Sequence, residues 1–129
     1  MRLSVVGVAG LMLAAGCGSV FEPDKRSVIL PITRINVPST VTPGASFSAA
    51  FIIQSGGCTR FERVETTKTD RALTVLARGT QAIGSNISCP QDIRYDTVVE
   101  VVTPPLANPF SVIGKQPDGT ETTAQVLVQ

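Results

Sequence analysis

The stretch from Ser46 to Gln54 reads SFSAAFIIQ, and its large apolar residues recur at every second position. Successive side chains of a β-strand point to opposite faces, so one face of this segment would carry Phe47, Ala49, Phe51 and Ile53. Such alternation is typical of a strand that covers a hydrophobic core with one face. The segment therefore predicts a β-sheet, and the residues on either side of it extend that prediction.

Strand patterns continue in both directions from this segment. Val, Ile and Thr are abundant, and turn residues return roughly every dozen positions, which is typical of an all-β sandwich or barrel. Strands are expected over residues 28–37, 46–54, 58–67, 71–79, 93–103, 110–114 and 121–128. The sequence thus predicts an all-β domain of about seven antiparallel strands.

Three of these segments carry irregularities that predict local detail. Pro31 lies inside the first strand, where the missing N–H predicts an edge position or a break. Phe61 and Val64 are three positions apart in the third strand, so a β-bulge is needed to turn both inward. In the strand over 93–103, apolar residues occur on both faces, which predicts cover on both sides.

The strand count and the order of strand, Val37-Pro38, turn, Pro43-Gly44 and strand resemble the immunoglobulin-like domains common on bacterial surfaces. The resemblance implies a β-sandwich of antiparallel strands. The chain departs from the antibody pattern, in which a disulfide joins two core strands beside a Trp, because it contains no Trp. A small closed β-barrel is the competing architecture.

The amino-terminal segment has the pattern of an export signal. Arg2 precedes the apolar stretch from Leu3 to Ala15, which is shorter than the roughly 20 residues of a membrane-spanning helix. It leads directly into Ala15-Gly16-Cys17, which resembles the lipobox of bacterial lipoproteins. We therefore expect a signal-peptide helix within residues 1–16.

The lipobox resemblance implies cleavage before Cys17 and acylation of that residue. Residues 17–26 would then form a lipidated tether, and residues 27–129 the immunoglobulin-like domain. Gly18 is compatible with transfer to the outer membrane or cell surface. The alternative is an ordinary secretory signal cut near Ala15, which leaves the thiol of Cys17 free.

Two further cysteines, Cys58 and Cys89, lie in the domain. In an oxidising envelope they are expected to form a disulfide. That bond would close a loop of about 30 residues and stabilise the domain by roughly 3–4 kcal/mol. Two buried free thiols are the alternative.

Composition excludes several classes of function. The chain of 129 residues has a formal net charge of +1, which argues against a nucleic-acid binder. It contains no His, so Ser-His-Asp catalysis, Cys-His catalysis and His-based metal sites are excluded. The sequence indicates no cofactor.

Charged residues gather on the third strand, as Arg60, Glu62, Arg63 and Glu65. Paired carboxylates can act as general acid and base, so a hydrolase using Glu62, Glu65 or Asp70 is one hypothesis. Cross-strand ion pairs on a solvated strand are the simpler interpretation. A basic face is a further hypothesis, formed by Arg60, Arg63, Arg71, Arg78 and Arg94.

Two loops are candidate binding regions, because long loops in compact domains are often functional. They cover residues 80–92, which include Cys89, and residues 103–108. We predict a non-enzymatic envelope lipoprotein, anchored to a membrane through Cys17, that acts as a structural or protein-binding module with an envelope protein as partner. A carrier of a small ligand or glycan is the alternative.

Overall fold

The computed structural model describes residues 24–129. The predicted signal-peptide helix and the lipidation of Cys17 lie outside the described residues. The first strand begins at Asp24, so residues 24–26 belong to the sheet and not to the predicted tether.

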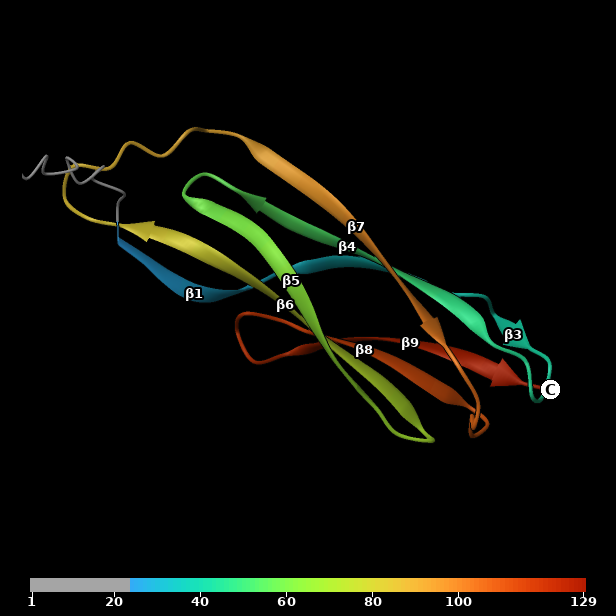
Figure 1. The fold of residues 1–129 in the computed structure, drawn as a ribbon. Coiled ribbons are helices and arrows are strands. Elements are labelled where there is room, and N and C mark those ends of the chain that lie inside the picture. Colours follow the sequence, from blue (N-terminus) through green and yellow to red (C-terminus); the bar gives the residue numbers. More distant parts are fainter. Residues whose placement is uncertain (1–23) are drawn as a thin grey trace, which may run out of the picture.

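The described residues form strands and no helix, which confirms the all-β prediction (Figure 1). The nine strand segments are β1 (Asp24–Leu30), β2 (Ile32–Asn36), β3 (Thr40–Val41), β4 (Phe47–Gly56), β5 (Thr59–Lys68), β6 (Ala72–Ile83), β7 (Ile93–Val102), β8 (Phe110–Lys115) and β9 (Glu121–Val128). The expected number was about seven. The difference comes from the first predicted strand, which is divided in two, and from the short β3.

The strands form one curled, mixed sheet in the order β2-β4-β5-β6-β8-β9-β3, with β1 beside β6 and β7 beside β4. The pairs β6–β8 and β3–β9 are parallel, so the expectation of a wholly antiparallel sheet is wrong. β4 and β5 pair only at Gly56 and Thr59, next to their turn. Because they separate beyond that point, the sheet folds over and encloses its apolar face.

The predicted break at Pro31 is present, and it moves the chain from one neighbour to another. Leu30 at the end of β1 pairs with Ala77 of β6, whereas Ile32 at the start of β2 pairs with Ile53 of β4. Proline has no N–H to donate to a ladder, but its carbonyl accepts a hydrogen bond from the N–H of Gln54 at 3.0 Å. The change of partner connects the two parts of the curled sheet.

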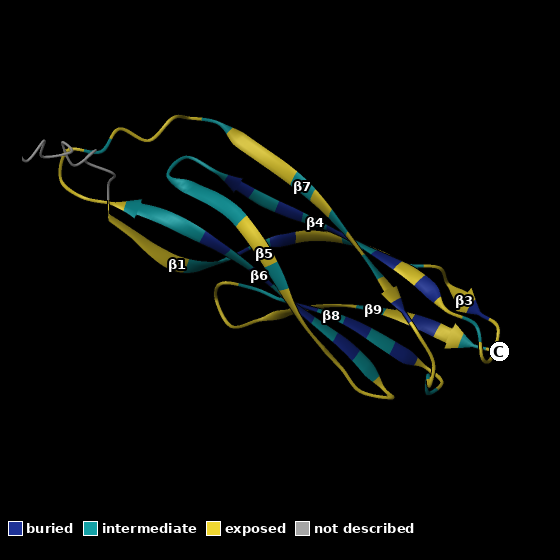
Figure 2. Ribbon diagram, in the orientation of Figure 1, coloured by how far each residue is buried: buried dark blue, intermediate teal, exposed yellow. Residues whose placement is uncertain are grey.

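The core is built from alternating residues, as the sequence predicted for β4. Phe51 and Ile53 are fully buried, and Phe47 packs edge-on against Phe110 of β8 with ring centroids 5.9 Å apart. Other strands add rows on the same side, including Leu73, Val75, Ala77, Val112 and Val126. Figure 2 shows buried positions alternating with less buried ones along β4, β6 and β8.

Two details of β5 and β6 depend on pairing. The predicted bulge in β5 is confirmed, since the register with β6 shifts between Phe61 and Arg63. β6 continues to Ile83, so residues 80–83 are strand rather than loop. Their pairing with both β1 and β5 explains the extension, because a strand bounded on two sides has its backbone groups satisfied.

The prediction of cover on both faces of β7 is wrong. Its inner face meets the core through Val98 and Val102, which lie beside Phe51 and Phe47 of the neighbouring β4. The outer face is open to solvent, and Val99 is 57% exposed.

Candidate functional site

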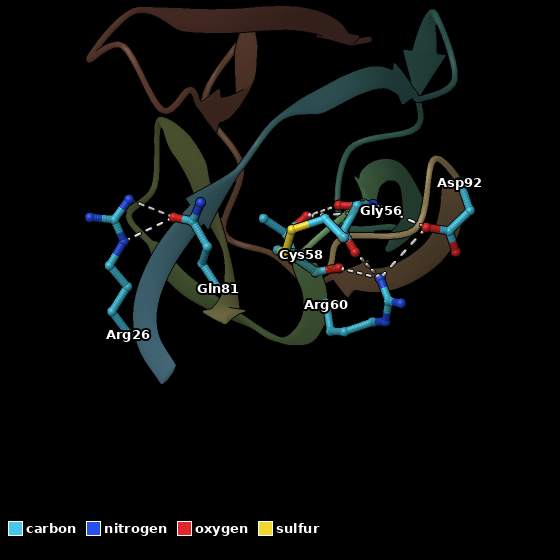
Figure 3. The surroundings of a disulfide bond; sticks show 9 residues. Arg26, Gly56, Cys58, Arg60, Gln81 and Asp92 are labelled. Atoms are coloured by element: carbon cyan, nitrogen blue, oxygen red, sulfur yellow. Dashed lines mark hydrogen bonds and ion pairs between the residues drawn. A yellow bond between two sulfur atoms is a disulfide. The ribbon is translucent and has the colours of Figure 1, made fainter. Parts of the chain in front are cut away.

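The predicted disulfide lies at one end of the sheet, between the β4–β5 turn and the loop after β6 (Figure 3). The Cα atoms of Cys58 and Cys89 are 4.9 Å apart, which is within the range for disulfides. The carbonyl of Cys58 also accepts a hydrogen bond from the N–H of Ala82 at 3.0 Å. The loop over residues 84–92 is therefore attached to the sheet at this end, which we call the disulfide corner (residues 56–60 and 84–94).

The backbone at this corner requires glycine. Gly56 has a φ of +132°, and a Cβ atom there would lie 2.1 Å from the carbonyl oxygen of Asp92. The next N–H, that of Gly57, donates both to this carbonyl oxygen and to Oδ1 of Asp92, at 3.1 and 3.0 Å. The close approach that these contacts need is available only without a side chain at position 56.

Asp92 is the electrostatic centre of the corner. Its Oδ2 accepts a hydrogen bond from Nε of Arg94 at 2.8 Å, and its Oδ1 lies 3.9 Å from Nη1 of Arg60. The hydrogen bond from Arg94 lowers the pKa of Asp92; the N–H of Gly57 and the charges of both arginines add to the effect, against partial desolvation. A carboxylate held ionised by several donors is suited to fixing loop geometry rather than to taking up a proton.

The side chain of Arg60 binds backbone carbonyl groups of the β4–β5 turn. Its Nη1 donates to the carbonyls of Gly57 and Thr59 at 3.1 and 2.7 Å (Figure 3). The hydroxyl of Thr59 in turn accepts from the N–H of Gly56 and donates to the carbonyl of the same residue. The side chains of this corner thus serve to hold the turn.

Two open hollows flank the disulfide corner. The larger, of about 440 Å³, lies where β1, the end of β4 and the start of β7 meet, and it is lined by Val28, Pro31 and Gln54 among others. The smaller, of about 300 Å³, lies beside Cys58, Arg60 and Ile87. Both open to solvent, so they are grooves on the surface rather than the deep apolar cavity that a carrier would need.

The charged cluster on β5 forms ion pairs. Arg63 lies 3.1 Å from both Glu62 and Glu65, and Arg78 of β6 lies 3.4 Å from Glu65. All four side chains are substantially exposed. Asp70 is in the β5–β6 turn, where its backbone carbonyl accepts from the N–H of Ala107. The pair of Arg78 and Glu65 joins β6 to β5, as the simpler interpretation predicts, whereas the two pairs of Arg63 lie within β5.

Four of the five candidate arginines form two separate pairs. Arg60 and Arg94 share Asp92, whereas Arg63 and Arg78 share Glu65. Arg71 lies in the turn that precedes β6. Each pair of arginines shares one carboxylate, whose negative charge lowers the positive electrostatic potential that a basic face would need.

The two candidate loops lie at opposite ends of β7, because the loop over 84–92 precedes this strand and the loop over 103–108 follows it. A strand of this length spans about 30 Å. The second loop is attached to other elements, since Nζ of Lys68 donates to the carbonyl of Pro105 and the N–H of Val128 donates to Oδ1 of Asn108. The two loops therefore do not form one binding surface.

The outer face of β7 was not identified as a site from the sequence. Its exposed apolar row consists of Ile93, Tyr95, Val99 and Val101, with exposed fractions of 57–66%. Thr97 completes the row, and we call these five residues the β7 row. β7 pairs with β4 alone within the described chain, so its other backbone edge is free there.

The β7 row continues onto the neighbouring strand. Ala50 lies opposite Val99 and Ile52 lies opposite Thr97 on the outer face of β4, and both are half-buried. A shallow hollow of about 410 Å³ borders Arg34, Ile52 and Tyr95. Large apolar patches on a surface mark interaction sites more often than single exposed residues do.

Comparison of the chain with protein-family models, with curated proteins and with solved structures finds no match in any of the three. Among residues 24–129 there is no helix long and apolar enough to cross a membrane. The same residues contain no cluster of three or more Cys, Asp or Glu side chains placed to hold a metal ion.

Proposed function

We propose that this chain is a lipid-anchored protein of the bacterial cell envelope whose β domain binds another protein through β7 and performs no catalysis. The observation that carries the proposal is the β7 row, which is mostly apolar, exposed and next to a strand edge that no other strand of residues 24–129 occupies. The anchor and the binding surface are supported by different residues, and they are tested separately.

The anchor is supported by the sequence around Cys17 and by where the sheet begins. Asp24 is the first residue of β1, and its partner Ile83 is next to the loop that contains Cys89. Asp24 is seven positions after Cys17, and a chain of that length can span at most about 25 Å. A lipid on Cys17 would therefore hold the disulfide corner close to the membrane surface.

The anchor is tested by growing cells with a labelled fatty acid and analysing the full-length chain. The natural chain should incorporate the label and sediment with membranes, whereas Cys17→Ala should do neither. A matched Cys58→Ala variant should keep the label. An unmodified amino terminus, or label that persists in Cys17→Ala, would contradict the anchor.

The binding role is supported by the chemistry of an unpaired strand edge. Such an edge presents unpaired N–H and C=O groups to which a strand from another chain can be added. Aromatic and β-branched residues beside it supply apolar contacts on the same face. Tyr95 and Val99 provide both kinds of residue next to the free edge of β7.

The binding role is tested with a photo-crosslinking amino acid in the full-length chain, placed at Val99 in one variant and at Thr123 in another. Thr123 is exposed on the outer face of β9, so it is the matched control. We expect a discrete protein adduct from position 99 and none from position 123. Equal adducts from both positions, or none from either, would contradict a protein-binding role for β7.

An immunoglobulin-like sandwich is our finer proposal for the architecture. It is supported by two groups of strands, β2-β4-β7 and β5-β6-β8-β9, whose apolar rows contribute to one core. An experimental structure with two separate facing sheets would agree with it. A sheet that pairs continuously around its circumference would instead indicate a barrel.

A further inference from the structure

The free edge of β7 has a charge pattern that can be tested against a second copy of itself. Suppose that the β7 strands of two copies pair edge to edge in antiparallel orientation. A two-fold axis perpendicular to the sheet then relates the copies and keeps their outer faces on the same side of the combined sheet. Residues directly opposite each other then point to the same face. The axis must therefore pass through the position of one β7 residue, which lies opposite its own copy. Every other residue then lies opposite the one that is equally far from this central residue on the other side.

Two registers pair β7 almost completely. With the axis at Thr97, residues 93–101 are paired; with the axis at Val98, residues 94–102 are paired. Registers centred elsewhere on β7 pair fewer residues. The comparison of the two long registers depends on the three charged residues of the strand, Arg94, Asp96 and Glu100, which all lie on the inner face.

The charges favour the register centred on Thr97. It places Arg94 opposite Glu100 on both sides of the axis and leaves Asp96 opposite Val98. The register centred on Val98 places Asp96 opposite Glu100, twice. Directly opposed side chains have Cβ atoms about 4.5–5.5 Å apart, where unlike charges attract and like charges repel.

The outer face is compatible with the same register. Ile93 would lie opposite Val101, Tyr95 opposite Val99, and Thr97 opposite its own copy. Each of these positions is exposed in the single chain. Aromatic and β-branched residues opposite one another, and Thr opposite Thr, are favourable cross-strand pairs. The β7 row would thereby continue from one copy into the next.

From these two observations we infer that the protein bound by β7 is a second copy of this chain, paired antiparallel about an axis at Thr97. The inference rests on the proposed function, because it names the partner of the same surface. The inward charges have a second effect: they oppose pairing in the other long register, which is one way in which proteins limit unwanted association at sheet edges.

The first test reverses the charges in the full-length chain, purified in detergent, and measures dimer dissociation by sedimentation equilibrium. Arg94→Glu and Glu100→Arg each place like charges opposite one another, and each should raise the dissociation constant about tenfold or more. The double variant restores unlike pairs and should return close to the natural value. The double variant still lacks the ion pair between Arg94 and Asp92 within one chain. Recovery of the dimer could therefore not be caused by restoring that ion pair.

A matched control uses the cross-strand pair of Lys115 and Glu121, which lies on β8 and β9. Exchanging these two charges should leave the dimer unchanged. If the exchange on β8 and β9 weakens the dimer as much as the single changes in β7, or if the β7 double variant fails to recover, the inference is wrong.

The second test locates the axis by crosslinking. Thr97→Cys places two thiols opposite each other and should give a covalent dimer with a short bismaleimide. Val101 is also exposed on the same face, but its partner in this register is Ile93, so Val101→Cys should give little covalent dimer. Equal yields from both variants, or a natural chain that is monomeric at every concentration, would overturn the inference.

The outcomes separate this inference from the proposed function. A monomer whose position-99 adduct contains a different protein would remove the self-pairing and leave the binding role of β7. A monomer with no adduct at position 99 would remove both. A dimer with the crosslinking pattern described above supports both.

Discussion

Gln116 joins two parts of the chain that are far apart in sequence. Its side-chain amide pairs with both backbone groups of Ile32: Oε1 accepts from the N–H at 3.2 Å, and Nε2 donates to the carbonyl at 2.8 Å. Nε2 also donates to the hydroxyl of Thr122. Ile32 is the first residue after the break at Pro31, so one side chain replaces the strand neighbour that the chain has just left.

We predict that Gln116→Leu lowers the free energy of unfolding by about 1–2 kcal/mol, because it leaves the N–H and carbonyl of the buried Ile32 without that partner. Denaturant titration of the natural and variant chains measures the difference. Gln125→Leu changes an exposed glutamine on β9 and should stay within about 0.5 kcal/mol. Equal effects of the two substitutions would contradict the role assigned to Gln116.

The lowered pKa of Asp92 predicts how stability depends on pH. A carboxyl group whose pKa is lower in the folded chain stabilises it above the ordinary value of about 3.9, and this contribution is lost as the pH falls through the folded value. Asp92→Asn should therefore be less stable than the natural chain at pH 7. The gap should narrow at pH values below about 3.9.

Unfolding titrations of both chains across this pH range provide the measurement. Asp24→Asn is a useful comparison, since it removes an exposed carboxyl at the start of β1. A gap between the natural chain and Asp92→Asn that stays constant, or grows, towards acid pH would show that the ionised carboxylate does not hold the corner.

At the scale of the elements, the disulfide joins the loop before β7 to the start of β5, a strand whose main partner is β6. β5 has a bulge and meets β4 only at the turn, so one of its edges is largely unpaired in the described part of the chain. The loop over 84–92 has no strand of its own. The bond between Cys58 and Cys89 attaches this loop to the residue before β5, beside the hydrogen bonds from Gly57 to Asp92.

We predict that the double variant Cys58→Ser and Cys89→Ser loses about 3–4 kcal/mol of stability, because the unfolded chain regains the entropy of a loop closed across 31 residues. Thermal or denaturant unfolding under oxidising conditions measures the loss. The natural chain with a reductant should show a similar loss. A change below about 1 kcal/mol would contradict a structural role for the bond.

Across the whole molecule, the two ends of the sheet differ in what they carry. The disulfide corner, the start of β1 and the two hollows beside the corner lie at one end. The carboxyl terminus and β3 lie at the other end (Figure 1). With the anchor we propose, the first end would face the membrane and the second would project from it.

This orientation predicts the result of a fluorescence experiment on the full-length chain. The chain has no Trp, so a single Trp is an unambiguous probe. Ile87→Trp at the disulfide corner should be quenched by vesicles with a nitroxide-labelled lipid headgroup, and Leu127→Trp on β9 should be quenched much less. Equal quenching at both positions would contradict the orientation.

The sequence alone determined the fold class and much of the core. Alternation in β4 identified Phe51 and Ile53 as buried, Pro31 located the break, and the spacing of Phe61 and Val64 located the bulge. These features are local, because the two-residue period of a strand and the missing N–H of proline act without distant partners.

The tertiary structure decided which strands pair with one another and in which direction. The parallel pairing of β6 with β8 and the placement of β7 beside β4 depend on contacts between distant segments. On β7 the pattern was misleading, because its more apolar face is the outer one, and only the pairing of Val98 with Phe51 fixes which face is inside. A period of two reports that two faces differ, whereas the register with a neighbouring strand determines which of them meets the core.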